Sequence, residues 1–184
     1  MTAPVVLTLP GWQGSGPDHW QSRWEALHGY TRVEQHDWLR PLRGDWTARL
    51  DEVVQQQQDR PVLLAAHSLG CLLTAWWAAH SRHTQRVAGA LLVAPPDIER
   101  DDNRQQIPGW APVARQRLPF RSILVASSDD PFGSLEGASR LAADWGADFV
   151  SLGPKGHINA DSGLGDWEEG HVLLLSLVPA EDAA

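Results

Sequence analysis

Ser68 is the residue of this chain whose surroundings point most directly to chemistry. It lies in "AAHSLG", between the apolar run "VLLAA" and a helical pattern that carries Leu72 and Leu73. The small residues two positions away, Ala66 and Gly70, are typical of a nucleophile elbow, a strained strand-to-helix turn that exposes a serine hydroxyl. The start of a helix there also favours a developing negative charge. The segment predicts a nucleophilic serine, although an ordinary strand-to-helix turn gives the same short pattern.

A base and an orienting acid for such a serine follow it along the chain. The apolar run "SILVASS" leads directly into Asp129 and Asp130, and "DFVSLG" leads into a glycine-flanked loop that contains His157. Because the carboxyl ends of parallel strands meet at one edge of a sheet, we expect Ser68, the aspartate pair and His157 to converge there. The chain order Ser, Asp, His fits a serine activated by this arrangement. Taken singly, the aspartates are also common turn residues and His157 could be an ordinary loop residue.

Other reactive side chains near these positions favour structural interpretations. His67 precedes Ser68, but adjacent side chains diverge at a turn, so it is not assigned as the base. His80 and His83 lie near a predicted helix end, where they are more typical of favourable charges than of metal ligands. Cys71 is interpreted as a packing residue rather than a reactive thiol. We therefore expect no metal ion.

A glycine-rich loop, "GWQGSGPDHW" from Gly11 to Trp20, joins the first apolar run to the first helical pattern. A phosphate loop would need a lysine and a hydroxyl residue after its last glycine, but Pro17 and Asp18 follow Gly16. The dinucleotide fingerprint fails as well, because His19 stands at the position of its third glycine. We expect neither a nucleotide nor any other cofactor.

The segments that must position these residues alternate between apolar runs and helical patterns. Six short runs rich in Val, Leu, Ile and Ala are interpreted as buried strands: Val5–Leu9, Arg32–His36, Val62–Ala66, Ala88–Ala94, Ser122–Ser127 and Asp148–Leu152. Strands of this kind, separated by helices, predict an α/β protein, a three-layer α/β/α sandwich with a six-stranded, mostly parallel sheet.

The helical patterns have recognisable starts. Three begin after the cap candidates Asp18, Asp45 and Ser134, and a last helix begins near Asp166, whose spacing to Glu169 resembles a capping box. Their buried faces are predicted to carry Trp20, Trp24 and Leu27, then Trp46, Leu50, Val53 and Val54, then Leu135, Ala138, Leu141, Ala142 and Trp145. Most of the 10 tryptophans should therefore lie in the core.

The chain of 184 residues is expected to form a single domain, residues 1–184, with a small excursion at about 95–119. This excursion is polar and interrupted by prolines. It either crosses the carboxyl edge of the sheet, where such folds bind ligands, or is a solvated connector with one short helix.

Charge and composition limit the partners. The formal net charge is −8 and lysine and arginine form no cluster, which argues against nucleic acid and anionic membranes as main partners. The sequence has 1 cysteine, and its start lacks the pattern of a secretory signal, so we expect a cytoplasmic protein. The longest apolar runs are shorter than the roughly 20 residues of a membrane helix.

Several segments together give a resemblance to a known family. The sequence is similar to the small α/β-hydrolases typified by the retinoblastoma-binding serine hydrolases and the YdeN-like bacterial proteins. The matching segments are "LPGWQGSGPDHWQSRWE", "AAHSLGC", "LLVAPPD", "LPFRSILVASSDDPF" and "GHINADSGLGDW". The resemblance implies a minimal hydrolase without a large lid domain, with Ser68 as nucleophile, His157 as base and Asp130 as acid. Ala66 replaces the glycine usual at that elbow position, and alanine also fits there.

The same resemblance suggests a role for the glycine-rich loop. In α/β-hydrolases the corresponding loop and the residue after the nucleophile each supply a backbone N–H to the oxyanion hole. Trp12 is our assignment for the first donor, with Gln13 as the alternative, and Leu69 for the second. Trp12 could also simply pack over the elbow helix.

The function that follows is a serine hydrolase acting on a small ester, thioester or amide through an acyl-enzyme. A non-catalytic protein-interaction module on the same fold is the alternative, because a fold does not by itself confer activity. The acyl group, the leaving group and the oligomeric state are left open by the sequence.

Overall fold

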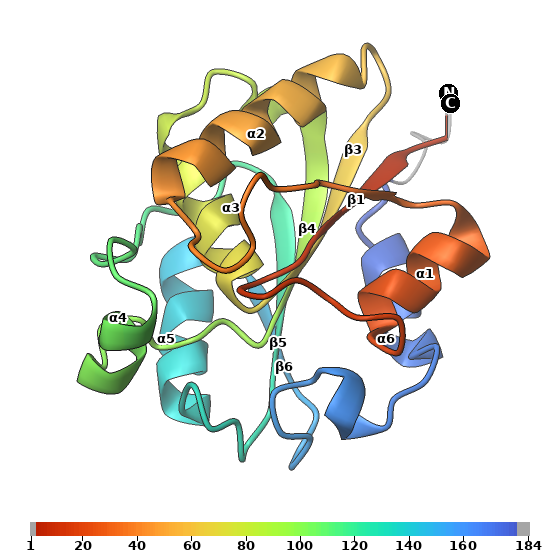
Figure 1. The fold of residues 1–184 in the computed structure, drawn as a ribbon. Helices are drawn as coiled ribbons and strands as arrows, with labels where there is room; N and C mark the ends of the chain where they lie inside the picture. The colour runs from red at the N-terminus through yellow and green to blue at the C-terminus, as the bar shows by residue number, and fades with distance from the viewer. Residues whose placement is uncertain (1–2, 180–184) are drawn as a thin grey trace.

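The chain folds into a three-layer α/β/α sandwich around a six-stranded, wholly parallel sheet, as predicted (Figure 1). The structure is a computed structural model that describes residues 3–179. The strand order across the sheet is β2-β1-β3-β4-β5-β6. The strands are β1 (Val5–Leu9), β2 (Thr31–Arg32), β3 (Val62–His67), β4 (Val87–Val93), β5 (Arg121–Ala126) and β6 (Asp148–Ser151).

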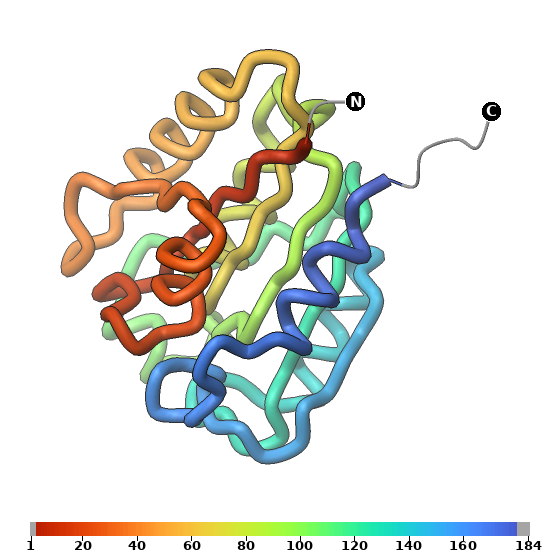
Figure 2. Tube along the Cα trace, turned by 90° about the vertical axis from the view of Figure 1, so that its right-hand side faces the viewer, coloured from red at the N-terminus to blue at the C-terminus, as the bar shows by residue number. Residues whose placement is uncertain are grey.

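Helices cover both faces of this sheet. One face is covered by α1 (Trp20–His28) and α6 (Glu168–Leu175), which lie over the sheet in Figure 2. The other is covered by α2 (Arg43–Gln56), α3 (Leu69–His80) and α5 (Leu135–Trp145). The described chain also has the short helix α4 (Asp101–Gln106) and the 3₁₀ turns Thr84–Arg86 and Ala160–Ser162. None of the helices in residues 3–179 is long and apolar enough to cross a membrane.

Alternation along the central strands divides the apolar core into two layers. In β3, Leu64 and Ala66 pack on the side of α2 and α3, whereas Leu63 and Ala65 pack on the side of α1 and α6. Successive side chains of a strand point to opposite faces, so a strand buried on both faces must be apolar throughout. Seven tryptophans are buried, which confirms that most belong to the core: Trp20, Trp24, Trp46, Trp77, Trp110, Trp145 and Trp167.

The second strand is shorter than predicted. In place of Arg32–His36, β2 contains only Thr31 and Arg32, at the edge of the sheet. The Val33 N–H still donates to a β1 carbonyl, but the chain then turns, and the Asp37 carboxylate accepts the backbone N–H groups of Leu39 and Arg40. This local hydrogen bonding competes with continuation of the edge strand.

Helix starts differ from three of the four predictions. The cap of α1 is His19, whose ring accepts the Gln21 N–H, rather than Asp18. Helix α2 begins at Arg43, with Asp45 inside its first turn, and α6 begins at Glu168 without a capping box at Asp166. Ser134 caps α5 as predicted.

The Asp166 carboxylate instead pairs with Arg23 at 2.6 Å, so a contact with α1 replaces the predicted local cap. Leu27 was predicted on the buried face of α1 but is 57% exposed. Its helix ends one residue later, at His28, so the last turn extends beyond the neighbouring core.

The segment 95–119 contains one short helix, α4, as the connector interpretation expected, but buried residues along it anchor it to the core. Ile98, Ile107 and Trp110 are buried in the layer of α2 and α3, and the Trp110 indole donates to the Pro41 carbonyl at 2.8 Å. The Asn103 amide donates to the backbone carbonyls of Asp97 and Phe132. These contacts hold the segment beside the loop that follows β5, at the carboxyl edge of the sheet.

Candidate active site

Ser68 occupies a strained turn between β3 and α3. Its backbone has φ 54° and ψ −121°, an unusual conformation for a residue other than glycine. Its N–H donates to the Val93 carbonyl at 2.8 Å, and its carbonyl accepts the Cys71 N–H, so both neighbours help to fix the turn. A β-carbon at Gly70 would overlap the Leu9 carbonyl oxygen on β1, which explains why this position requires glycine. The strained serine is thus held by the surrounding strands.

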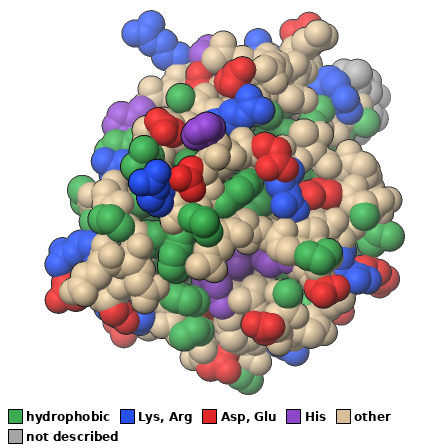
Figure 3. Space-filling model, in the orientation of Figure 1, with side chains coloured by type: hydrophobic (Ala, Val, Ile, Leu, Met, Phe, Trp, Pro, Cys, Tyr) green, Lys and Arg blue, Asp and Glu red, His purple; other side chains and the backbone are tan. Residues whose placement is uncertain are grey.

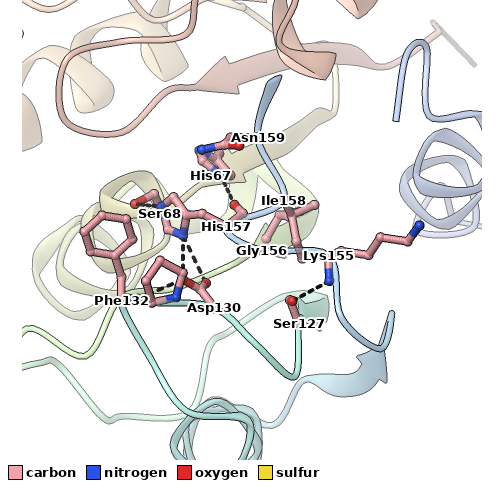
Figure 4. A network of polar contacts seen from close by, with 12 residues as sticks. His67, Ser68, Ser127, Asp130, Phe132, Lys155, Gly156, His157, Ile158 and Asn159 are labelled. Atoms are coloured by element: carbon pink, nitrogen blue, oxygen red, sulfur yellow. Dashed lines mark hydrogen bonds and ion pairs between the residues drawn. The ribbon is translucent and has the colours of Figure 1, made fainter. Parts of the chain in front are cut away.

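His157 lies between Ser68 and Asp130 (Figure 4). Its Nε2 is 2.9 Å from Ser68 Oγ, and its Nδ1 is 3.0 Å from each Asp130 carboxylate oxygen. The side chains of His157 and Asp130 are only 11% and 5% exposed. The structure therefore joins three predicted site residues in one chain of hydrogen bonds, in a largely dehydrated setting where such bonds are strong.

Asp129, the neighbour of Asp130, faces a different part of the same loop. Its Oδ1 accepts hydrogen bonds from the Ser127 hydroxyl and the Gly156 N–H, each at 2.8 Å. The Ser127 hydroxyl oxygen also accepts the Lys155 N–H, a contact drawn in Figure 4. The Gly156 N–H, followed by the other donors, lowers the pKa of the Asp129 carboxyl. Asp129 therefore fixes the backbone before His157, while Asp130 contacts the imidazole.

The backbone near Ser68 distinguishes the two candidates for the first-loop donor. The Gln13 N–H donates to the Trp38 carbonyl at 2.9 Å and is therefore engaged elsewhere. Within residues 3–179, the backbone N–H groups of Trp12 and Leu69 have no acceptor. The Trp12 indole donates to the Leu39 carbonyl, and its half-buried ring packs on the core. The Trp12 side chain therefore has a packing role, and its backbone N–H has no hydrogen-bond acceptor among the described residues.

A cavity of about 320 Å³ opens at Ser68. Apart from histidines, its lining carries no charged or ionisable side chain among the described residues. The apolar part consists of Trp12, Pro96, Ile107 and Phe132, and the amides of Gln13, Asn103, Gln106 and Asn159 provide polar groups. Figure 3 shows histidine side chains grouped at the surface, near the middle of the face that is turned to the viewer. The cavity therefore offers apolar and neutral polar contacts beside Ser68.

A second cavity, of about 370 Å³, shares Pro96 with the first but does not reach Ser68. Its lining includes Glu99, Arg115 and Arg140. These charges are already paired, Glu99 with Arg115 at 3.1 Å and Arg140 with Glu136 at 3.3 Å. Of these two cavities, only the smaller is lined by Ser68 and His157.

The remaining candidates lie in structural positions. The Cys71 thiol is buried beneath the elbow, where burial raises its pKa. The His80 ring stacks on Trp76, and His83 pairs with Asp51 at 3.1 Å. No cluster of three or more His, Cys, Asp or Glu side chains that could hold a metal occurs in the part of the chain that the structure describes.

Sequence reasoning missed His19, which borders the cavity with its ring nitrogen 3.3 Å from His67. In the sequence it appeared only as the residue that replaces a glycine of the nucleotide fingerprint. Its contact with His67 spans 48 positions of the chain, so neither hydrophobic periodicity nor a short motif reveals it.

Comparison with known proteins assigns the chain to a family. The model of the serine hydrolase family matches residues 6–176. The chain therefore belongs to the serine hydrolase family, within the α/β-hydrolase superfamily. The protein is a hydrolase enzyme.

Solved structures of other proteins share this fold. A YdeN-like hydrolase from Pectobacterium atrosepticum is 28% identical, with a TM-score of 0.81 over 96% of this chain and 94% of that one. The ydeN gene product from B. subtilis is 19% identical, with a TM-score of 0.76 over 95% and 98% of the two chains. Est1E from Butyrivibrio proteoclasticus, in a structure with ferulic acid bound, is 13% identical, with a TM-score of 0.73 over 96% and 90%. No curated protein matches the sequence significantly.

Proposed function

We propose that Ser68, His157 and Asp130 form a catalytic triad that hydrolyses a small ester, thioester or amide through an acyl-enzyme. The observation that carries the proposal is the continuous chain of hydrogen bonds from Ser68 Oγ through the His157 ring to Asp130. A serine at its ordinary pKa is a weak nucleophile, and an adjacent base that is itself oriented by a third group activates it.

Each residue has a distinct part in the reaction. His157 Nε2 takes the proton from Ser68 Oγ as the oxygen attacks the acyl carbon, and the same proton then goes to the departing alcohol, thiol or amine. Water next attacks the acyl-enzyme, giving a proton to His157, which returns it to Ser68 as the acid leaves. Asp130 keeps the Nδ1–H of His157 in place and stabilises the imidazolium that forms at each step.

Two backbone donors stabilise the negatively charged oxygen of the tetrahedral intermediate in this proposal. Leu69 is the first residue of α3, and Trp12 lies in the loop that passes over the elbow. The unengaged state of these two groups supports the assignment, as does the hydrogen bond that occupies the alternative donor, Gln13. Donors that are fixed before the reaction stabilise developing charge without reorganisation.

The cavity favours an uncharged acyl group of modest size. Trp12, Ile107 and Phe132 provide apolar contacts, and a carboxylate on the acyl chain would find no cationic side chain among the described lining residues. Burying an unpaired charge is strongly unfavourable. We therefore infer that short neutral acyl chains are preferred over dicarboxylic ones.

Turnover of p-nitrophenyl esters tests this function. Acetate, butyrate, octanoate and hemisuccinate esters should show a maximum of kcat/KM among the short neutral chains, and Ser68→Ala should remove turnover of all of them. Cys71→Ala, three residues further along the same turn, serves as the matched control and should retain turnover. Equal turnover by wild type and Ser68→Ala would contradict the proposal.

A further inference from the structure

Two adjacent residues at the start of α1 support the loop of the proposed base, Trp20 directly and His19 through His67. The Trp20 indole donates to the Ile158 carbonyl at 3.0 Å. His19 contacts His67, and His67 Nε2 donates to the His157 carbonyl at 2.8 Å, the bond drawn in Figure 4. Two consecutive carbonyls of the base loop are therefore held from the side opposite Asp130.

The hydrogen bonds fix the positions of the ring hydrogens. His19 Nδ1 accepts the Gln21 N–H at 3.1 Å, so the hydrogen of a neutral His19 ring lies on Nε2. This Nε2–H points to His67 Nδ1, and the two nitrogens are 3.3 Å apart. His67 Nδ1 must therefore be the acceptor. The hydrogen of His67 consequently lies on Nε2, facing the His157 carbonyl, which can only accept. Each nitrogen of the pair thus has a suitable partner.

Burial keeps both rings neutral. It lowers the pKa of His19 to about 3, with smaller contributions from His157 and Arg32. It also lowers the pKa of His67 well below its ordinary value, helped by His19 and His157. At neutral pH the pair therefore keeps the single arrangement of hydrogens in which every contact is satisfied.

We propose that His19 and His67 are positioning residues that hold the backbone of the base loop so that His157 points at Ser68. The inference rests on the proposed function, because it gives the pair a role in the same reaction. His67 acts on the His157 carbonyl, and His19 acts through His67 by fixing which of its nitrogens carries the hydrogen.

Such support is needed because the base loop is strained. Ile158, directly after His157, has φ 49°, a conformation unfavourable for a β-branched residue. The strain persists only when surrounding contacts fix the segment. Without the bond from His67, the His157 carbonyl could rotate and carry the imidazole away from Ser68. A misplacement of about 1 Å can cost on the order of 100-fold in rate.

His67→Phe and His67→Gln test the proposal. Phenylalanine keeps an aromatic ring but donates nothing, whereas glutamine can place an N–H near the position of Nε2. For p-nitrophenyl butyrate, we expect kcat of His67→Phe to fall about 10- to 100-fold with KM within about twofold, and His67→Gln to recover much of the loss. His80→Phe is the matched control. It also replaces a histidine whose ring contacts a backbone carbonyl, that of Trp76 in α3, and it should leave kcat unchanged.

Several outcomes would overturn the positioning role. The first is a folded His67→Phe with the kcat of wild type. The second is an equal loss of kcat in His67→Phe and His67→Gln. The third is a rise in the KM of His67→Phe with no change in kcat. If His67→Phe does not fold, His67→Asn replaces it, because its shorter side chain does not reach the carbonyl. The proposal then requires that His67→Gln exceed His67→Asn in kcat.

The role of His19 is tested by coupling. His19→Phe should lower kcat less than His67→Phe, and adding it to His67→Phe should have little further effect, because it acts through the residue already lost. Independent losses that multiply in the double variant would contradict this arrangement.

Imidazole ¹⁵N NMR of the wild-type protein separates this inference from the proposed function. Both rings should be neutral, with hydrogen on Nε2. Other tautomers in an enzyme that hydrolyses esters would overturn the positioning role and leave the function standing. The expected tautomers in a protein without turnover would overturn the proposed function, and with it the positioning role of the pair.

Discussion

The loops after β1 and β5 both build the candidate site, but the first contributes backbone next to Ser68 and the second contributes side chains around His157. The loop after β5 contributes carboxylates, Asp130 to the His157 ring and Asp129 to the Gly156 N–H. The loop after β1 contributes backbone. A β-carbon at Gly11 would lie 2.9 Å from Ser68 Cβ and 3.1 Å from the Leu69 nitrogen, closer than such contacts normally are.

This difference determines what a substitution can reveal. A carboxylate can be replaced by an amide of the same shape, which removes charge and keeps the fold. A backbone contribution has no side chain to remove, and is disturbed only by adding one where the chain passes too closely. The expected effects on turnover therefore differ in both cause and size.

Asp130→Asn should have the largest effect of the three substitutions. An amide can donate to His157 Nδ1 and favour the wrong tautomer, and in a serine protease with the same triad this change costs on the order of 10⁴ in turnover. We expect kcat/KM for p-nitrophenyl butyrate to fall by about two to four orders of magnitude, with a melting temperature close to that of wild type. Near-normal turnover would remove Asp130 from the proposed triad.

Gly11→Ala should have an intermediate effect. The added methyl group must displace the first loop from the elbow, and losing one oxyanion donor costs about 10²- to 10³-fold in kcat in a serine protease. We expect a fall in kcat of about 10- to 10³-fold. Gly16→Ala is the matched control in the same loop, because a β-carbon there meets no atom within 4 Å. Equal effects of the two substitutions would contradict a specific backbone role for Gly11.

Asp129→Asn should have the smallest effect, with turnover within about tenfold of wild type. The amide oxygen can still accept from Ser127 and Gly156. Because the pKa of Asp129 is lowered in the fold, its charged form stabilises the protein above its unfolded pKa, and this contribution is lost as the pH falls. The melting temperature of the variant should be slightly lower at neutral pH and equal to that of wild type in acid. A larger loss of turnover than in Asp130→Asn would reverse the roles of the two acids.

The same difference explains how much the sequence revealed. The positions of Ser68, Asp130 and His157 relative to the sheet were predictable, because each follows an apolar strand and parallel strands place such positions at one edge. The choice of Asp130 over Asp129 came from the family resemblance, because the order of hydrogen bonds between these aspartates and His157 depends on loop geometry. Choosing Trp12 over Gln13 likewise depends on the bond between Gln13 and Trp38, two segments that meet only in the folded chain.

Local features were least predictable where tertiary contacts compete with them. Asp166 has the spacing of a cap but pairs with Arg23 on another helix. His19 rather than Asp18 caps α1, and the ring of His19 also contacts His67 in the core. In both cases a residue interpreted from its sequence neighbours is placed by a distant part of the fold.

The central claim is that Ser68 is activated as a nucleophile, and covalent labelling by a fluorophosphonate tests it most directly. Such reagents react with activated serines and thereby report the state of the hydroxyl rather than its presence. The account predicts one adduct per chain, mapped by mass spectrometry to the peptide containing Ser68, absent from Ser68→Ala and strongly slowed in Asp130→Asn. Folded wild-type protein that remains unlabelled, or an adduct on another residue, would contradict it.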